Sequence, residues 1–199
     1  DDINELRSVT GLKLSNSILF GPIGLDLGEF PFSEPPSGIL QFIFVGRLLK
    51  EKGIFEYLAA AERIKKKFPF VKFLILGDVD EGNRWALPKE VLSEAVADGI
   101  VDHAGHVKNV SEMLAQSSVF VLPSYREGWS RSTQEALAIG RAIITTDAPG
   151  CRDSVVDGWN GYIVKARNVD DLVVAMERFV MNRDLVRIFG YRSHQFAVK

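Results

Sequence analysis

The stretch that decides the fold runs from Gly38 to Gly77 and reads GILQFIFVGRLLKEKGIFEYLAAAERIKKKFPFVKFLILG. It is apolar almost throughout as far as Gly46, which is typical of a strand covered on both faces. Apolar residues then recur at helical spacing from Ile54 to Phe68, and a second apolar run follows directly. Strand, helix and strand in so short a span predict a βαβ unit with parallel strands.

The same alternation continues along the chain. Further strands are expected near residues 100–105, 119–122, 142–145 and 162–164, and helices near 89–97, 110–116, 132–139, 169–181 and 184–189. Repeated alternation of this kind predicts an α/β fold with a doubly wound, Rossmann-like parallel sheet and helices on both of its faces. Such sheets bind ligands at the carboxyl ends of their strands, around the point where the strand order reverses.

The first part of the chain differs in composition from the rest. Residues 1–37 are rich in Gly, Pro and Ser, with one apolar run at Ser17–Phe20, so we expect an initial strand followed by an inter-domain linker. Residues 38–199 are expected to form one domain, because 46% of the chain is hydrophobic and can fill a sizeable core.

Composition and charge exclude several classes of partner. Lys and Arg total 24 against 26 for Asp and Glu, which gives no electrostatic reason to expect nucleic acid binding. Cys151 is the only cysteine, so no internal disulfide can form, and it is expected to be a small packing residue. With three histidines in all, the sequence predicts no metal site.

The sequence also bears on the compartment. Its single cysteine fits a reducing environment, its start lacks the basic region of a signal peptide, and no apolar run approaches the roughly 20 residues that span a bilayer. We therefore expect a cytoplasmic chain. Peripheral association of the full-length protein with the inner face of the membrane stays open.

A cationic turn follows the first predicted strand. Gly46, Arg47, Lys52 and Gly53 lie between the end of this strand and the start of a helix, whose backbone N–H groups and positive dipole end attract anions. The turn is therefore a candidate diphosphate site. An ordinary turn with solvated cations is the alternative, and the segment does not match the G-x-G-x-x-G pattern of dinucleotide-binding proteins.

An acidic segment follows the strand at 119–122. Glu127 and Glu135 would lie about 12 Å apart on one continuous helix at ~1.5 Å per residue, but Gly128 argues for a loop before the helix begins. A loop Glu127 and a helical Glu135 can each accept hydrogen bonds from sugar hydroxyls, while backbone N–H groups of residues 129–132 receive an anion. The alternative is a charge at a helix start and a solvated helix residue.

The two segments together favour the interpretation that both bind one ligand. A cationic turn at one strand end and two carboxylates at another are what a diphosphate flanked by two polyols requires. A nucleoside diphosphate sugar has this construction.

From about residue 39 to 164 the sequence resembles the C-terminal domain of the family 4 retaining glycosyltransferases of the GT-B fold, also called group 1 glycosyl transferases. The resemblance is carried by Phe44–Leu48 with Lys52-Gly53, Leu74–Asp78, the two glutamates within Glu127–Ala138, and Thr146–Asp153 followed by Asp157–Gly161. The earlier Gly24-Leu25-Asp26 with Phe30 is similar to the segment that joins the family's two domains.

The resemblance implies a role for each matching residue. Arg47 and Lys52 match the basic pair that binds the diphosphate of the sugar donor and stabilises its departure, and Glu127 matches the glutamate beside the reacting sugar. These three residues are the implied catalytic group. Glu135 would hold the ribose hydroxyls. The remaining implied donor-binding residues are Gly46, Val107, Gly128, Trp129, Ser130 and Arg131, with Val107 at the base.

The implied reaction is transfer of a sugar from a nucleoside diphosphate sugar to a hydroxyl acceptor, a glycan or a lipid-linked sugar, with retention at the anomeric carbon. The family suggests a uridine diphosphate sugar, no metal and no cofactor, and an acceptor site on an N-terminal domain outside this chain. This part alone should therefore bind the sugar donor without turnover. A nucleotide-sugar epimerase and a non-catalytic nucleotide-binding module are the alternatives.

Overall fold

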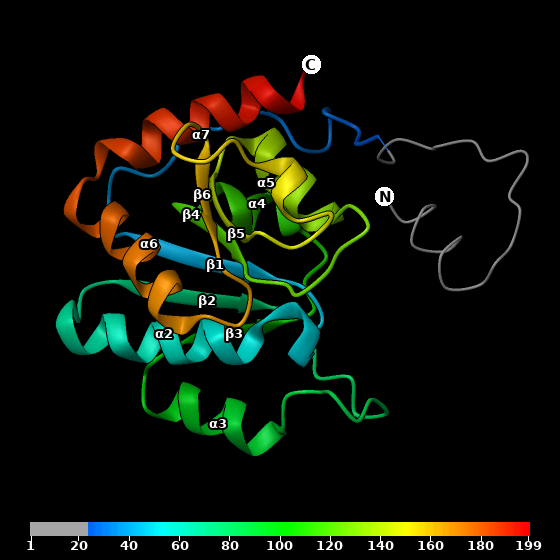
Figure 1. Cartoon of the computed structure of the whole chain (residues 1–199), viewed down its shortest axis with the longest axis vertical. Coiled ribbons are helices and arrows are strands. Elements are labelled where there is room, and N and C mark those ends of the chain that lie inside the picture. Colours follow the sequence, from blue (N-terminus) through cyan, green and yellow to red (C-terminus); the bar gives the residue numbers. More distant parts are fainter. Residues whose placement is uncertain (1–23) are drawn as a thin grey trace, which may run out of the picture.

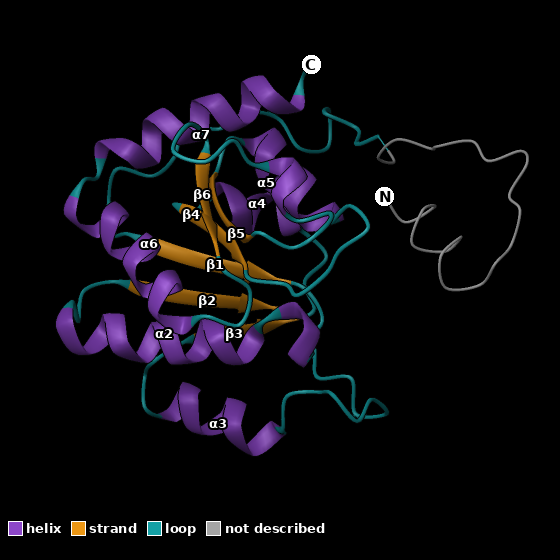
Figure 2. Ribbon diagram, viewed as in Figure 1, coloured by secondary structure: helices purple, strands orange, loops and turns teal. Residues whose placement is uncertain are grey.

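A six-stranded parallel sheet forms the centre of the structure (Figures 1 and 2), in the strand order β3-β2-β1-β4-β5-β6. The computed structural model describes residues 24–199, so the strand predicted at Ser17–Phe20 lies outside the described residues. The strands are β1 (Gln41–Val45), β2 (Lys72–Leu76), β3 (Asp102–Gly105), β4 (Val119–Leu122), β5 (Ala142–Thr146) and β6 (Gly161–Val164). The predicted doubly wound parallel sheet is confirmed.

Helices cover both faces of this sheet. They are α2 (Ile54–Lys67), α3 (Lys89–Ala97), α4 (Val110–Ala115), α5 (Arg131–Ile139), α6 (Val169–Met181) and α7 (Asp184–Ala197), with two 3₁₀ turns, η1 (Lys50–Lys52) and η2 (Arg152–Ser154). Helices α2 and α6 contact each other on one face, whereas α5 contacts α4 and α7 on the other (Figure 1). Both faces of the central strands are therefore covered, which explains their continuous apolar sequence.

Tyr57 ties α2 to two strands. Its side chain is fully buried, and its hydroxyl lies 2.9 Å from the carbonyl oxygen of Phe42 in β1 and 3.1 Å from that of Leu74 in β2. Burial raises the pKa of Tyr57 well above its usual value, so this phenol stays neutral and donates its hydrogen. The helix of the predicted βαβ unit is thus fixed across both of its strands.

The strand order reverses between β1 and β4. Strands β2 and β3 extend the sheet on one side of β1, whereas the chain returns to place β4, β5 and β6 on the other side. The ladder between β1 and β4 pairs Phe42 with Val119 and Ile43 with Phe120, and so ends before either strand does. The point at which ligands bind in such sheets is therefore this β1–β4 junction.

Gly53 lets the turn after β1 approach the end of β4. Its backbone has a left-handed φ of 74°, and a Cβ atom at this position would lie 2.1 Å from the carbonyl oxygen of Pro123. Only glycine satisfies both conditions without displacement. The cationic turn and the segment after β4 are therefore in direct backbone contact.

The last helix is longer than the sequence predicted. The expected end near residue 189 is wrong, because α7 continues to Ala197. Gly190 lies inside the helix, where a Cβ atom would come within 2.3 Å of the carbonyl oxygen of Gly140. This glycine serves close packing of α7 on the end of α5, and tertiary contact outweighs its low helix propensity.

Arg141 fastens the segment before β1 to the domain. The side chain is fully buried, and its guanidinium donates to the carbonyl oxygens of Ser33, Ala115, Ser117 and Ile139. The Ser33 amide in turn donates to the Ile139 carbonyl at 3.0 Å. Burial lowers the pKa of Arg141 to about 10, and its network of carbonyl acceptors offsets the cost of burying the charge.

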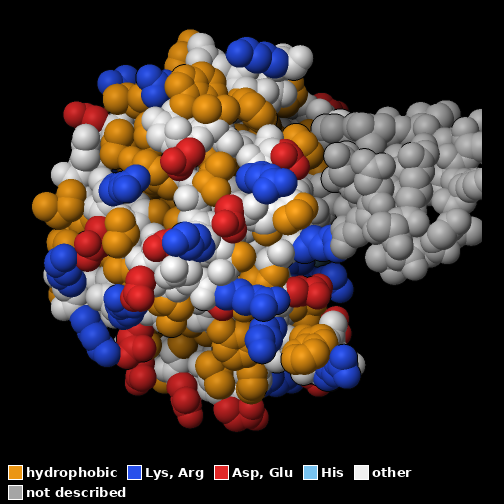
Figure 3. All heavy atoms as spheres, in the orientation of Figure 1, with side chains coloured by type: hydrophobic (Ala, Val, Ile, Leu, Met, Phe, Trp, Pro, Cys, Tyr) orange, Lys and Arg blue, Asp and Glu red, His pale blue; other side chains and the backbone are white. Residues whose placement is uncertain are grey.

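Positive and negative side chains alternate over the face that carries α2 and α6 (Figure 3). Within the described residues, no helix has the length and apolar character needed to cross a membrane.

Candidate functional site

The two predicted segments flank the point where the strand order reverses. The cationic segment follows β1 and the acidic segment follows β4, and these strands are neighbours in the sheet. In Figure 2 the loops after β1 and β2 emerge from the pointed ends of the strand arrows, on one side of the sheet. The sequence therefore placed its candidate residues where parallel sheets bind ligands.

Lys52 and Glu127 are in direct contact. The Lys52 Nζ lies 2.6 and 2.7 Å from the two carboxylate oxygens of Glu127, and these side chains are 20% and 9% exposed. The Ser124 hydroxyl donates to the same carboxylate at 2.7 Å. Glu127 is therefore oriented by two hydrogen-bond donors, and it lies in the loop before α5, whose N-cap is Ser130.

Glu135 lies within α5, where the sequence placed it. Its side chain is 10% exposed, and its carboxylate accepts a hydrogen bond from Arg131 Nε at 3.0 Å. Burial raises the pKa of Glu135, partly offset by Arg131. It is therefore not a solvated helix residue. Ser130 is the N-cap of this helix, and its hydroxyl accepts from the Thr133 amide at 3.4 Å.

A second group of predicted residues lines a cavity of about 450 Å³ beside β1, β2 and β3. Its lining includes Gly46, Arg47 and Val107, together with His106. The Arg47 side chain is 63% exposed and lies 3.9 Å from the Asp80 carboxylate. Residues predicted to hold a phosphate and a base thus share one concave surface.

The predicted residues fall into separate groups. Lys52 pairs with Glu127 and Arg131 pairs with Glu135, whereas Arg47 lines a cavity whose lining includes none of these four. The loop residue Gly128 is exposed, and Trp129 lines a different, largely apolar cavity of about 330 Å³ formed with α5 and α7.

Sequence reasoning missed Ser124. This residue is fully buried, and besides its hydroxyl contact with Glu127 its carbonyl accepts from the Thr146 hydroxyl. The available signal was a serine directly after a strand end and three residues before the loop glutamate. Cys151, 3% exposed, lies behind the same carbonyl, and burial raises the pKa of its thiol, in agreement with a packing role.

Chemically, the Lys52–Glu127 pair provides a fixed carboxylate that accepts hydroxyl hydrogens beside an ammonium that attracts anions. Residues 24–199 contain no group of three or more His, Cys, Asp or Glu side chains arranged to hold a metal ion.

The family profile described as "Glycosyl transferases group 1" matches residues 29–196, which is most of the chain. The chain belongs to this family. The family resemblance drawn from the sequence is thereby confirmed, and group 1 glycosyl transferases include proteins that build polysaccharides and other glycans.

Two glycosyltransferases illustrate the likeness. The chain is 32% identical to the N,N'-diacetylbacillosaminyl-diphospho-undecaprenol alpha-1,3-N-acetylgalactosaminyltransferase of Campylobacter jejuni. The 130 aligned residues cover 65% of this chain and 32% of that protein. The chain is also 27% identical to the capsular polysaccharide biosynthesis glycosyltransferase CapM of Staphylococcus aureus, and the 190 aligned residues cover 94% of this chain and 50% of that protein. The chain thus spans a third to a half of the length of these relatives.

Solved structures share the fold of this group 1 glycosyl transferase chain. Anabaena HepE in complex with UDP superposes with a TM-score of 0.75 at 17% identity, over 87% of this chain and 50% of that one. The C-terminal domain of a group 1 family protein, LpcC of Francisella tularensis, superposes with a TM-score of 0.70 at 21% identity, over 88% of this chain and 97% of that one. The fold is the Rossmann-like half of GT-B glycosyltransferases.

Proposed function

We propose that this chain is the part of a retaining glycosyltransferase that binds a nucleoside diphosphate sugar, a UDP-sugar in the first instance. One observation carries the proposal: the largely shielded Glu127 is held by Lys52 and Ser124 at the β1–β4 junction of a group 1 glycosyl transferase. The UDP bound to HepE, a protein of the same fold, supports uridine as the first base to test.

Arg47 and Lys52 are proposed to bind the diphosphate. Both follow β1, and a diphosphate between them would meet the N-terminal end of α2, which begins at Ile54. In the reaction, the bond from the anomeric carbon to the diphosphate oxygen breaks while a bond to the acceptor oxygen forms on the same face. The hydroxyl proton leaves with the diphosphate, and two cations stabilise the charge that develops on the leaving group.

The two glutamates are proposed to bind the two ends of the ligand. Glu127 would accept hydrogen bonds from hydroxyls of the transferred sugar, and Glu135 from the ribose hydroxyls. Val107 would contact the base from the cavity beside β3. Gly46 and the loop residues Gly128 to Arg131 would approach the phosphates and the sugar with their backbone atoms.

The acceptor is proposed to be a hydroxyl of a glycan or of a lipid-linked sugar, bound by a second domain. We propose residues 1–37 as the connection to that domain and residues 38–199 as the donor-binding domain. The proposed reaction needs no metal and no cofactor. We further propose that the full-length protein works in the cytoplasm, at the inner face of the membrane when the acceptor is lipid-linked.

Calorimetry of this chain with UDP, GDP, ADP and their glucose conjugates tests the proposal. UDP-glucose should bind, and Arg47→Ala and Glu135→Ala should each weaken binding about tenfold, since contacts to charged groups contribute about 1.5–3 kcal/mol. Arg187→Ala on α7 and Glu94→Ala on α3 are matched controls at exposed positions. Absence of saturable binding of every nucleotide would refute the proposal, as would equal effects of test and control variants.

A further inference from the structure

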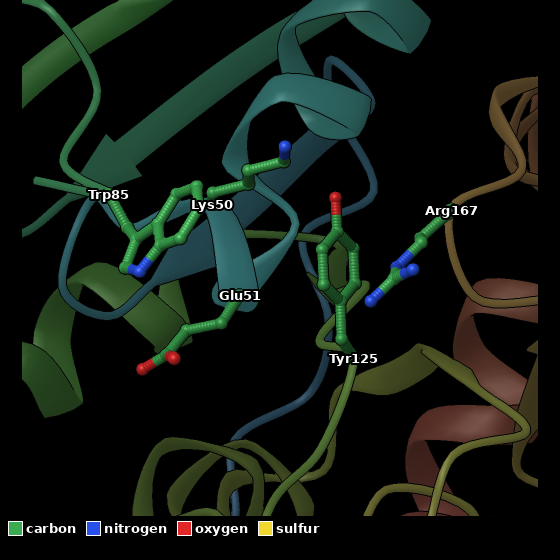
Figure 4. Close-up of a pocket in the computed structure, with 5 residues that line it drawn as sticks. All are labelled: Lys50, Glu51, Trp85, Tyr125 and Arg167. Atoms are coloured by element: carbon green, nitrogen blue, oxygen red, sulfur yellow. The ribbon is translucent and has the colours of Figure 1, made fainter.

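A second concave site lies at the same edge of the sheet, outside the residues assigned to the sugar donor. It is a cavity of about 280 Å³ lined by Lys50, Glu51, Trp85, Tyr125 and Arg167 (Figure 4). These residues follow the carboxyl ends of β1, β2, β4 and β6, so segments distant in the sequence converge on it. We propose that this cavity binds a phosphorylated monosaccharide.

The aromatic walls of the cavity are fixed by backbone contacts. Trp85 is held because its carbonyl accepts from the Lys50 amide at 2.8 Å, and Leu49 bridges to Ala86 beside it. Tyr125 is held because its amide donates to the Glu51 carbonyl at 2.8 Å. In Figure 4 Lys50 lies between the two rings, and the Glu51 side chain extends away from Tyr125. Trp85 nevertheless remains 48% exposed, so part of its side chain is accessible to a ligand.

Cations gather around these rings without a carboxylate partner. The Arg167 guanidinium carbon lies 4.6 Å from the centroid of the Tyr125 ring, and Lys50 Nζ lies 5.5 Å from that of Trp85. Arg84 lies 4.8 Å from the same indole. Within residues 24–199, none of these three cations forms an ion pair. Their hydrogen-bond donors are therefore available to an anion.

Arg167 is directed into this site by an unusual backbone conformation. It is the only residue other than glycine with a positive φ in the described part of the chain, at 61°. Such a conformation is rare for long side chains and often occurs at functional sites. Here it directs a guanidinium onto the Tyr125 ring, whose hydroxyl is fixed by Glu56 Oε1 at 2.6 Å.

The lining specifies more than an anion. Aromatic faces pack against the apolar face of a sugar ring, and the carboxylate of Glu51 accepts hydrogen bonds from sugar hydroxyls, which favours a ligand that carries hydroxyls beside its phosphoryl group. Lys50 and Arg167 would bind the phosphoryl oxygens. Cavities that enclose drug-sized ligands measure roughly 300–1,000 Å³. This cavity lies just below that range, so it fits a monosaccharide phosphate better than a whole nucleotide sugar.

The cavity is distinct from the proposed donor site although they share one turn. In η1, Lys52 contacts Glu127 while Lys50 lines the cavity, so the two lysine side chains belong to different sites. Likewise Tyr125 faces the cavity, whereas Glu127, two residues later, contacts Lys52. Removal of cavity side chains should therefore leave nucleotide binding intact.

The test is calorimetric titration of the 199-residue chain with glucose 1-phosphate, glucose 6-phosphate and N-acetylglucosamine 1-phosphate, beside glucose, inorganic phosphate and UDP. At least one sugar phosphate should bind at least tenfold more tightly than glucose or inorganic phosphate. Trp85→Ala and Arg167→Gly should each weaken it about tenfold. Glycine suits the left-handed backbone at 167, which protects the fold of that variant.

Arg187→Gln, an exposed cation of α7, is the matched control and should change sugar phosphate affinity less than twofold. UDP affinity should be the same in the wild type and in both cavity variants. Three results would each overturn the proposal: no sugar phosphate binds, inorganic phosphate binds as tightly as any of them, or the cavity variants lose UDP together with the sugar phosphate. Weak UDP binding in the wild type would count against the proposed function alone.

Discussion

Lys52 and Glu127, 75 residues apart in the sequence, form an ion pair in which one ammonium group contacts both carboxylate oxygens, at 2.6 and 2.7 Å. The pair joins the turn after β1 to the loop after β4, the two strands at which the sheet reverses its order. Because both side chains are largely shielded from water, their attraction is screened less than that of surface pairs.

The first prediction concerns the strength of this pair. Lys52→Met should lower the free energy of unfolding by about 1–3 kcal/mol, because it leaves a shielded carboxylate with fewer partners. Adding Glu127→Gln should restore part of the loss, which gives a coupling energy of about 0.5–3 kcal/mol in a double-mutant cycle measured by urea unfolding. Lys66→Met, in the exposed pair with Glu62, should cost no more than about 0.5 kcal/mol. Additive effects at positions 52 and 127 would contradict the prediction.

The second prediction separates backbone strain from steric contact. Gly53 and Gly158 have similar left-handed φ angles of 74° and 71°, but only a Cβ atom at Gly53 would meet a neighbour within 4 Å, the Pro123 carbonyl. Gly158→Ala should therefore cost about 1–2 kcal/mol, the strain alone. Gly53→Ala should cost about 1–3 kcal/mol more, measured by urea unfolding, because the turn must move. Equal costs would show that the close approach does not matter.

The third prediction concerns pH. Burial raises the pKa of Glu135 above its unfolded value of 4.5, so the folded state binds more protons in the window just above that value. Stability from this group is therefore fully present below about pH 4.5 and declines as pH rises through the raised pKa. Relative to Glu135→Gln, the wild type should lose stability across this window. If the difference in unfolding free energy between the wild type and Glu135→Gln does not change from pH 4 to pH 8, this prediction is wrong.

The same carboxyl should affect ligand binding in the opposite direction. Ribose hydroxyls donate best to an ionised Glu135, so UDP affinity of the wild type should rise with pH over that window. Glu135→Gln should bind UDP more weakly at neutral pH, with a flatter pH profile in calorimetry.

The fourth prediction concerns Arg141. Arg141→Met should lower the free energy of unfolding by about 3–5 kcal/mol, because it leaves several buried carbonyl groups without a donor. The Ser33 amide should also exchange its hydrogen faster, since the segment before β1 loses its attachment. Arg183→Met is the matched control: it removes one hydrogen bond to the Gly38 carbonyl at a more exposed position and should cost about 1 kcal/mol. Comparable losses in the two variants would contradict this account.

The sequence predicted the sheet because the buried strands β1 and β2 are local runs of apolar residues, and because apolar residues recur at helical spacing from Ile54. It also predicted which strand ends carry the candidate residues, since topology follows from the order of the elements. The direct contact of Lys52 with Glu127 could not be predicted, because it depends on side-chain geometry across two loops. Whether Arg47 and Glu135 bind one ligand stays a prediction.

Other features were hidden because they depend on tertiary context. Arg141 resembles a surface residue in the sequence, yet carbonyl groups from four residues surround it. The low helix propensity of Gly190 gives no sign of its place inside α7, where it allows the helix to pass close to Gly140. The cavity around Trp85 combines five residues from four segments that are distant in the sequence, and no local pattern identifies such a set.

The short ladder between β1 and β4 has a consequence for how such a chain can change. Beyond Ile43 and Phe120, each strand stays hydrogen-bonded to its outer neighbour, β1 to β2 and β4 to β5. At the carboxyl ends of β1 and β4, the two halves of the sheet are thus joined by loop contacts, the close approach of Gly53 to Pro123 and the Lys52–Glu127 pair, in place of strand hydrogen bonds. Substitutions in these two loops can therefore alter the shape of the junction, and with it the preferred ligand, while every strand keeps its hydrogen bonds.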